Sequence, residues 1–438
     1  MGVTVAEAKP RPRLIDGERV VALTGATVID GTDAAPRPDA VVAIEKDRIV
    51  YVGDRAGVRL GKKVKTVDLA GCWVVPGFID THVHIPGVYE RTAFLAQVAA
   101  YGTTTVREAA GAQMELRELV AKGEVPGPRI VAAGLLIDGK HSVWGWAAHV
   151  ETVEELRTEV RKQLEKKPDF IKLYVGLPPL LVKAAVEEAH ARGVRVMGHL
   201  GKTTWGEAAE LGIDSLAHSW HAGLTHSVVP AANQAEFRGF YVPNKGFRAS
   251  QFRRWREVVD PKGPEVARLG ELLHRRHIEL HPNLVLGEAV LLGDDATVRE
   301  RLDPKATGRH PYSDNWSKEE MAEAKRAFPV MLAIIRVFHE RGVLLTAGTD
   351  YMNPWMTPGV AYHRELELFV QAGIPPADVL RIATRNGAEG LGILKETGTI
   401  EVGKAADLVV LEADPLASIS NTRKIERVFL RGQEVAGP

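Results

Sequence analysis

Two histidines close a short apolar segment of the chain. The stretch Val75-Pro-Gly-Phe-Ile-Asp-Thr-His-Val-His84 reads as a buried strand that ends in His82 and His84. Residues two apart in a strand point to the same side, so both imidazoles would face one small volume, which suits a divalent metal ion. The pattern alone fits two solvated histidines at a strand end equally well. The choice between the two interpretations depends on partners further along the chain.

A lysine interrupts a second apolar segment. Lys172 lies in the predicted strand Phe170-Ile-Lys-Leu-Tyr174, where burying a charged ammonium group would be costly. Either the side chain points out of the sheet towards a helix carboxylate, or burial lowers its pKa and leaves a neutral amine. A neutral amine can react with carbon dioxide. The resulting carbamate at Lys172 would be anionic, and its two oxygen atoms could bridge two metal ions.

His199, His218 and Asp350 each end a further apolar segment. Each has a plain alternative explanation, because isolated histidines are often structural and an Asp after Gly-Thr is a plausible helix cap. Two histidines on adjacent strands directly after the lysine strand nevertheless favour a shared site. In a barrel, the last strand would bring Asp350 beside the first strand and its histidine pair.

Two divalent cations carry four positive charges, and a lysine carbamate, Asp350 and a bridging hydroxide would carry three negative charges. The remaining positive charge favours polarising the carbonyl or phosphoryl oxygen of a substrate. Imidazole, carboxylate and carbamate ligands accept several metals. We expect zinc, with manganese, cobalt or iron as alternatives.

The segments that carry these residues alternate with amphipathic helical segments from Val75 onward. Eight strands are predicted, starting at Val75, Thr103, Arg129, Phe170, Val194, Ser215, His277 and Val343. Eight strand–helix units predict an α/β fold, a (β/α)₈ TIM barrel over residues 75–396. The connections Ser219–Arg276 and Asn283–Arg341 exceed one helix, so we expect these insertions to wall the site.

The two chain ends lack this alternation. Short strands separated by Asp-Gly and Gly-Asp turns are predicted before Val74, and strands return after Gly398, for example at Asp407–Leu411. We therefore expect one composite β-sandwich domain, built from residues 1–74 and 397–438.

Formal net charge is zero, with 56 basic and 56 acidic residues, so nothing favours nucleic acid as a partner. The single cysteine, Cys72, excludes an intramolecular disulfide and a cysteine-based zinc site. The first residues lack an apolar signal segment, and no stretch predicts a membrane span, so we expect a cytoplasmic protein and, by default, a homo-oligomer. The basic stretch Phe247–Arg256 is interpreted as a solvated helix face, with an anion or membrane patch as the alternative.

The candidate ligands and their flanking motifs resemble the amidohydrolase superfamily, in the prolidase-like and imidazolonepropionase-like branch. The motifs are Pro76–Asp80, His363–Leu368, Ala383–Ala388 and Gly398–Leu411. The resemblance implies that His82, His84 and Asp350 bind a more buried metal, that carboxylated Lys172 bridges both metals, and that His199 and His218 bind the more exposed one. It also implies that Asp350 takes a proton from the attacking hydroxide and passes it to the leaving group.

Aromatic side chains gather in the segments that follow the predicted strands. Five tryptophans lie there: Trp144, Trp146, Trp205, Trp220 and Trp355. As a set they predict a pocket for an apolar or aromatic group, although any one of them can be a core residue. The residues expected to contact substrate are His141, Trp144, Tyr174, Trp205 and Trp220.

We therefore predict an enzyme that hydrolyses an amide bond of a small molecule, a dipeptide or N-acyl amino acid with a bulky apolar part. A lactone, carbamate, organophosphate or mycotoxin amide is the alternative substrate, because the same hydroxide attacks all these centres. A barrel that has lost its chemistry is the remaining alternative.

Overall fold

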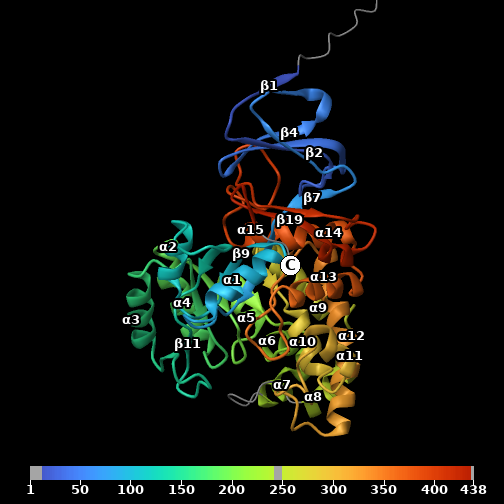
Figure 1. Ribbon diagram of the computed structural model, residues 1–438. Coiled ribbons are helices and arrows are strands. Elements are labelled where there is room, and N and C mark those ends of the chain that lie inside the picture. The colour runs from blue at the N-terminus through green and yellow to red at the C-terminus, as the bar shows by residue number, and fades with distance from the viewer. Residues whose placement is uncertain (1–11, 241–248, 436–438) are drawn as a thin grey trace, which may run out of the picture.

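The computed structural model describes residues 12–240 and 249–435, which form a β-rich part and a larger α/β part (Figure 1). The β-rich part contains one eight-stranded sheet, ordered β20-β19-β18-β7-β2-β3-β4 with β6 alongside β2. Its strands are β2 (Val20–Val28), β3 (Arg37–Glu45), β4 (Arg48–Asp54), β6 (Lys65–Asp68), β7 (Trp73–Pro76), β18 (Leu408–Leu411), β19 (Ile425–Leu430) and β20 (Gln433–Val435). A separate pair, β1 (Arg13–Ile15) and β5 (Val58–Leu60), is parallel.

Strands from both chain ends share this sheet, as the sequence predicts. β7 pairs antiparallel with β18, with Val75 opposite Val409. Apolar side chains of both strands and of β2 and β3 form one buried cluster, which includes Leu23, Val42, Val74 and Leu408. The arrangement of these strands as a two-layer sandwich stays a prediction.

In the sequence, the apolar runs Val20–Leu23 and Ala26–Ile29 predict two strands, and Thr399–Ile400 predicts a further one. The structure has the single strand β2 in place of the first two. Gly25, with φ of 85°, lies in the middle of β2, where the pairing with β3 shifts register between Thr24 and Ala26. A bulge at a glycine lets one strand continue through a residue that reads as a break. Thr399 and Ile400 were also predicted as a strand, but they form none; the Ile400 amide donates instead to the carbonyl oxygen of Asp30.

The α/β part is TIM-barrel-like and contains two sheets of parallel strands. The first has the order β10-β9-β8, with β8 (Phe78–Val83), β9 (Thr103–Glu108) and β10 (Arg129–Ala132). The second has the order β12-β11-β13-β14-β15-β16-β17, with β11 (Ile137–Asp138), β12 (Ala148–His149), β13 (Phe170–Leu173), β14 (Arg195–Gly198), β15 (Ser215–Ala217), β16 (Glu279–His281) and β17 (Leu344–Leu345).

Backbone contacts join the two sheets at both of their meeting points. At one, the Gly134 amide donates to the Phe170 carbonyl oxygen over 2.7 Å. At the other, the Thr81 amide donates to the Ala347 carbonyl oxygen over 2.9 Å. β8 therefore lies beside the segment that follows β17, which brings residues from opposite ends of the α/β part together.

Helices follow most of the parallel strands: α1 (Arg91–Ala100), α2 (Met114–Ala121), α3 (Val153–Leu164), α4 (Pro179–His190), α5 (Trp205–Glu210), α13 (Val360–Gln371), α14 (Pro376–Arg381) and α15 (Gly387–Gly390). Local sequence explains their limits. α3 begins after Thr152, whose hydroxyl accepts from the Glu155 amide while the Glu155 carboxylate accepts from the Thr152 amide. Leu156 and Val160 then recur at helical spacing and are buried against the sheet.

Both long connections carry several helices, as predicted. The connection after β15 contains α6 (Ala222–Ser227), α7 (Gln234–Phe240), α8 (Ala249–Val258) and α9 (Pro264–Arg275). The connection after β16 contains α10 (Leu284–Leu291), α11 (Ala296–Leu302) and α12 (Lys318–Glu340). Figure 1 shows α7, α8, α11 and α12 at the end of the molecule opposite the β-rich part. Within the described ranges, no helix is long and apolar enough to span a membrane.

The basic stretch Phe247–Arg256 contributes most of α8 (Ala249–Val258). Residues 247 and 248 of this stretch lie outside the described ranges. Its arginines pair with carboxylates: Arg253 with Glu257, Arg254 with Glu236, and Arg256 with Glu323. Arg253 and Arg254 are 71% and 41% exposed, which agrees with the predicted solvated helix face over the described part of this stretch.

Candidate metal centre

Strand ends from both sheets bring His82, His84 and Asp350 together. His82 lies in β8, His84 follows it directly, and the amide of Asp350 donates to the carbonyl oxygen of His82 over 2.7 Å. Nε2 of His84 lies 3.0 Å and Nε2 of His82 lies 3.4 Å from Oδ1 of Asp350. One ligand atom from each of the three residues lies within 4.8 Å of the others, which is a geometry that a single ion can share.

His218 and His199 continue the cluster on the neighbouring strands. His218 follows β15 with φ of 70°, and its Nε2 lies 3.7 Å from Oδ2 of Asp350, which itself has φ of 59°. The rings of His199 and His218 are 4.0 Å apart, and those of His82 and His218 are 5.0 Å apart. Two non-glycine residues in the left-handed region at one site indicate backbone held in place by its surroundings, as is frequent at functional sites.

Lys172 lies in β13 and is fully buried, 1% exposed. Its side chain lines the same cavity as the histidines and Asp350, which excludes the outward orientation towards a helix carboxylate. Burial lowers the pKa of Lys172 to about 7, so a large fraction of the amine is neutral at neutral pH. A neutral, buried amine beside metal-ligating side chains is the reactant that carbamate formation requires.

Burial also controls the protonation of the histidines. It lowers the pKa of His82, His199 and His218 well below the ordinary value, so these imidazoles are neutral and able to bind a cation. Burial alone would raise the pKa of Asp350, but the neighbouring His218, the hydrogen bond from His84 and the nearby Lys172 lower it to about 2. The carboxylate is therefore ionised at every pH at which the protein is expected to work.

The donor atoms fit a metal. Within the described residues, buried ring nitrogens without a hydrogen-bond partner include both nitrogens of His82, Nε2 of His199 and Nδ1 of His218. Unpaired buried nitrogens are costly in an empty protein interior, and a coordinated cation would satisfy them. The neutral imidazoles, the ionised Asp350 and the Lys172 amine supply the nitrogen and oxygen ligands that suit zinc and related ions.

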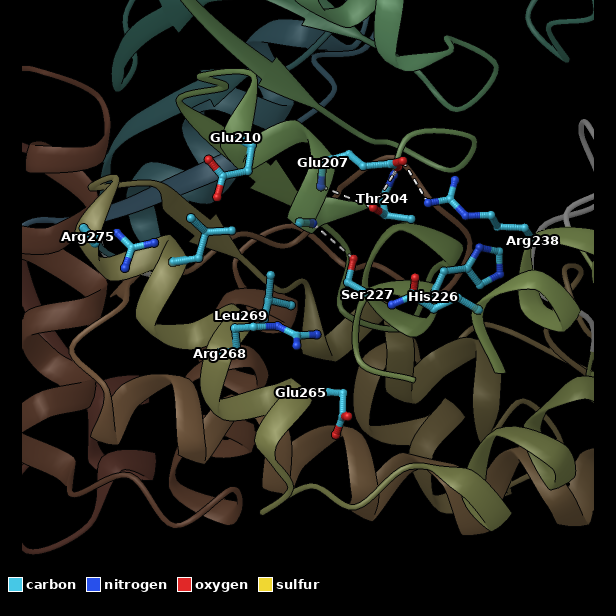
Figure 2. Close-up of a pocket in the computed structure, with 13 residues that line it drawn as sticks. Thr204, Glu207, Glu210, His226, Ser227, Arg238, Glu265, Arg268, Leu269 and Arg275 are labelled. Carbon is cyan, nitrogen blue, oxygen red and sulfur yellow. Dashed lines mark hydrogen bonds and ion pairs between the residues drawn. The ribbon is translucent and has the colours of Figure 1, made fainter. Parts of the chain in front are cut away.

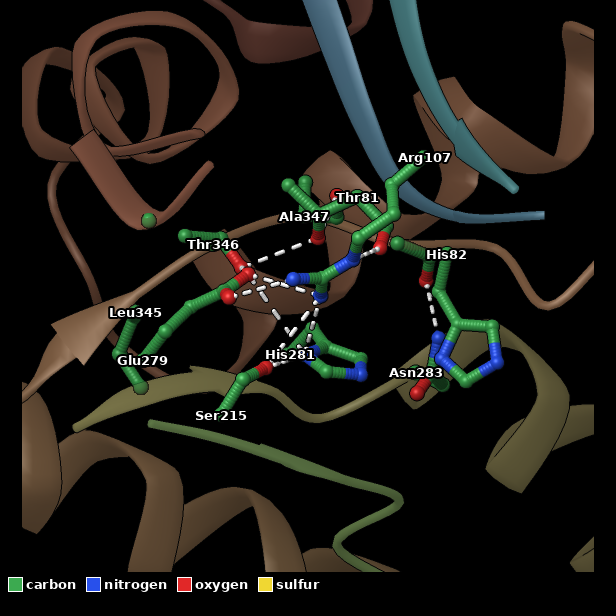
Figure 3. Close-up of polar contacts among 12 residues, drawn as sticks. Thr81, His82, Arg107, Ser215, Glu279, His281, Asn283, Leu345, Thr346 and Ala347 are labelled. Carbon is green, nitrogen blue, oxygen red and sulfur yellow. Dashed lines mark hydrogen bonds and ion pairs between the residues drawn. The ribbon is translucent and has the colours of Figure 1, made fainter. Parts of the chain in front are cut away.

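A buried charged network lies beneath these ligands, as Figure 3 shows. Arg107 of β9 donates to both carboxylate oxygens of Glu279 of β16, over 2.7 and 3.0 Å, and to the carbonyl oxygen of Thr81. Nη2 of Arg107 also lies 3.1 Å from Nδ1 of His281, whose ring is 4.9 Å from that of His82. The network connects β8, β9 and β16 directly under the candidate ligands.

Two carboxylates support the histidine pair from the side. Asp80 accepts from the Thr349 hydroxyl over 2.7 Å and from the His82 amide over 3.2 Å. Glu108 accepts from the Gly111 amide over 2.7 Å and lies 3.7 Å from Nδ1 of His84. The sequence did not reveal these two carboxylates or the network around Arg107. The available signal was a charged residue within or at the end of an apolar strand, the same signal that singled out Lys172.

The candidate ligands form the floor of a cavity of about 730 Å³. Of the residues predicted to contact substrate, Trp144, Tyr174 and Trp220 line it, and Trp146 lines it as well. Two predictions need correction. His141 is an exposed loop residue that does not line the cavity, because the turn at Gly139–Ser142 lies outside it. Trp205 begins α5 and is fully buried in the main apolar core, as any large apolar side chain facing a sheet would be.

A second cavity of about 340 Å³ lies between α5 and α9 (Figure 2). Its walls carry arginines and carboxylates, of which Arg238 and Glu207 pair over 2.8 Å. These two side chains are 47% and 32% exposed. This pair is therefore partly solvated and is satisfied by its own partner.

The sequence of the α/β part and of the composite sheet matches that of known proteins. The Amidohydrolase family profile matches residues 73–221 and 312–435, which is more than half of the chain. The chain belongs to the amidohydrolase family. This amidohydrolase is 26% identical over 407 residues to the imidazolonepropionase of Rhizobium meliloti (strain 1021), covering 87% of each protein.

The family profile, the sequence relatives and the solved structures together place the chain in the prolidase-like and imidazolonepropionase-like branch of this superfamily. The putative prolidase of Bifidobacterium longum superposes with a TM-score of 0.71 and 25% identity, over 96% of each chain. The A. niger ochratoxinase superposes with a TM-score of 0.70 and 20% identity, over 96% of each chain, and this similarity concerns the fold. The family assignment makes the amidohydrolase a hydrolase of carbon–nitrogen bonds, and the family uses divalent metal ions.

Proposed function

We propose that the protein is a binuclear metal-dependent hydrolase that cleaves an amide bond in a small molecule with a bulky apolar or aromatic part. The proposed metal ligands are His82, His84, Lys172, His199, His218 and Asp350. The observation that carries the proposal is that all six side chains line one cavity, although they come from strands far apart in the chain. Zinc is the proposed metal, and Lys172 is proposed to be carboxylated.

Bound divalent ions would lower the pKa of a coordinated water and polarise the scissile carbonyl group. Within that site, Asp350 acts as the proton carrier. Its carboxylate is ionised and therefore able to accept a proton from the attacking water and deliver it to the leaving nitrogen. Lys172 would hold the two ions together through its carbamate, and Arg107 and Glu279 would fix the strands on which the ligands stand.

The domain limits proposed from the sequence agree with this assignment. We propose a closed barrel over residues 75–396 and a composite β-sandwich over residues 1–74 and 397–438. Support comes from the backbone contacts at both meeting points of the parallel sheets and from the pairing of β7 with β18. Homo-oligomeric assembly and a cytoplasmic location stay predictions from the sequence.

The walls of the cavity support a substrate with an apolar group, since Leu135, Trp144, Trp220 and Leu286 all line it. The sequence predicted dipeptides or N-acyl amino acids as substrates. A carbamate, lactone, organophosphate or mycotoxin amide is the alternative, and the fold similarity to an ochratoxinase makes aromatic amides worth including. A screen of amides against esters and phosphotriesters would separate these substrate classes.

The test is to measure bound metal and amide hydrolysis in the purified protein. We expect about two metal ions per chain, loss of activity on chelation, and recovery with added metal that is faster in the presence of bicarbonate. Lys172→Ala and Asp350→Asn should each lower kcat/KM by about 1,000-fold or more. Lys183→Ala, at an exposed lysine of α4, is the matched control and should retain activity. Full activity in Asp350→Asn, or in metal-free protein, would exclude the proposed mechanism.

A further inference from the structure

The mouth of the cavity above the candidate metal centre is unusually apolar for a protein surface. Large apolar side chains that the structure leaves exposed gather there: Val143, Trp144, Trp146, Tyr312 and Met352 all line this cavity. Trp144 and Trp146 lie side by side with ring centroids 5.8 Å apart. Exposed apolar side chains concentrated around one opening mark a surface that binds an apolar partner or ligand.

The charges in the cavity are confined to its floor and one side. Among the described residues that line it, the side chains able to carry a positive charge at neutral pH are Lys172 and His84, both at the metal centre, and the acidic ones are Asp350 and Glu108. Glu108 is already engaged by the amides of Gly111 and Ala110. The walls and the mouth are formed by aromatic, aliphatic and uncharged polar side chains.

Two uncharged polar side chains at the mouth, Tyr312 and Asn353, are also engaged. The Tyr312 hydroxyl donates to Oδ1 of Asn353 over 2.7 Å, and the amide group of Asn353 donates to the carbonyl oxygen of Asp350 over 2.6 Å. This chain of hydrogen bonds ties the mouth to the metal centre. It leaves the tyrosine oxygen as an acceptor, which suits a neutral N–H donor and not a carboxylate.

A substrate carboxylate held against the apolar walls, away from the metal centre, would lose water without gaining a cationic partner. Transfer of an unpaired charge into an apolar site is strongly unfavourable, and the acidic groups already present would add repulsion. A neutral aromatic or aliphatic group would instead displace water from the tryptophan and leucine surfaces, which is favourable because apolar area is buried.

We infer that the substrates are uncharged amides, with an apolar group seated between Trp144, Trp146 and Trp220, and that the site discriminates against dipeptides and N-acyl amino acids with a free carboxylate. The inference rests on the proposed amide hydrolysis and narrows its substrate class. Addition of one water would then convert the neutral amide into a carboxylic acid and an amine.

The test compares two amides that differ in a single carboxylate, N-acetyl-2-phenylethylamine and N-acetylphenylalanine, on the metal-loaded enzyme. We expect kcat/KM to be about 100-fold or more higher for the neutral compound, since an unpaired buried charge costs several times the thermal energy. Binding gives a second readout: quenching of tryptophan fluorescence in Asp350→Asn should show the same preference in Kd.

A charge added at the mouth sharpens the test. Met352→Arg places a cation beside the exposed tryptophans, and Met352→Gln is the matched neutral control. The preference for the neutral compound should shrink by about 10-fold in Met352→Arg relative to Met352→Gln. A wild-type enzyme that hydrolyses or binds N-acetylphenylalanine as well as the neutral compound overturns the inference, and so does failure to bind either. Failure of the proposed function would give a different result. The neutral compound would still bind more tightly, but no metal-dependent hydrolysis would be measured.

Discussion

Two ion pairs in this amidohydrolase have similar nitrogen–oxygen distances but lie in different surroundings. Arg107 and Glu279, beneath the candidate metal centre, approach to 2.7 Å and are 0% and 2% exposed. Arg238 and Glu207, in the cavity between α5 and α9, approach to 2.8 Å and are 47% and 32% exposed (Figure 2). The shortest distances are therefore similar, but Arg107 donates to both carboxylate oxygens of Glu279 while Arg238 donates to one of Glu207, and the surroundings differ.

The comparison shows what distinguishes a working site from a hollow in the surface. The buried pair has lost its water, so each partner depends on the other, on Thr81 and on His281 for compensation. The exposed pair remains solvated and contributes little. Burial of groups that need partners, together with their convergence on one point, marks the metal centre. A cavity with arginines and carboxylates around it does not.

The largest change in the free energy of unfolding is expected when one partner of the buried pair is removed. Arg107→Met would leave Glu279 as an uncompensated buried charge, and breaking such a pair costs about 3–5 kcal/mol. Urea denaturation followed by circular dichroism measures this change in the free energy of unfolding. The double variant Arg107→Met, Glu279→Met should recover part of the loss, because it removes both charges. A loss below about 1 kcal/mol in Arg107→Met would mean that the network does not hold the strands.

The sequence allowed the candidate ligands to be predicted because each one interrupts or ends an apolar strand at a recognisable position. Lys172 and Asp350 stand out for this reason, and the parallel strands bring such positions to one end of the sheets. The alternation of strands and helices likewise fixed most of the fold, including the return of the C-terminal strands to the N-terminal sheet.

The supporting residues could not be predicted in the same way. Arg107 and Glu279 are 172 positions apart, so their pairing depends on a three-dimensional register that no local pattern contains. Trp205 and Trp144 have the same residue type in similar sequence surroundings, yet one is in the core and the other lines the cavity. Which face of an element a tryptophan occupies is decided by packing partners distant in the chain. The bulge at Gly25 in β2 is a local feature, but its sequence resembles that of a turn.

Acid should remove more stability through the buried pair than through the exposed one. Burial alone would raise the pKa of Glu279, but Arg107 and the contact with His281 hold it well below the ordinary 4.5. A depressed pKa in the folded state stabilises the protein above the unfolded-state pKa, and this stabilisation is lost as the pH falls below about 4.5. The slope of unfolding free energy against pH below this value should be shallower in Glu279→Gln than in the wild type.

Glu207 provides the matched control for that measurement. Its pKa is also lowered: burial opposes the shift, while hydrogen bonds from Thr204 and Arg238 produce it. Because Glu207 is partly exposed, solvent screens these contacts, and Glu207→Gln should change the acid slope less than Glu279→Gln does. Equal slopes in the two variants would remove the distinction between the clusters.

The smallest effect is expected from the exposed partner itself. Arg238→Ala removes the ion pair with Glu207, but the Glu207 carboxylate keeps its contacts with the Thr204 amide and hydroxyl, both at 2.9 Å. We expect the free energy of unfolding to change by less than about 1 kcal/mol, and amide hydrolysis to be unchanged. Urea denaturation and kcat/KM measured side by side with Arg107→Met check both statements. If Arg238→Ala lowered kcat/KM while leaving stability intact, the cavity between α5 and α9 would have to communicate with the metal centre, and burial would no longer be sufficient to tell the two clusters apart.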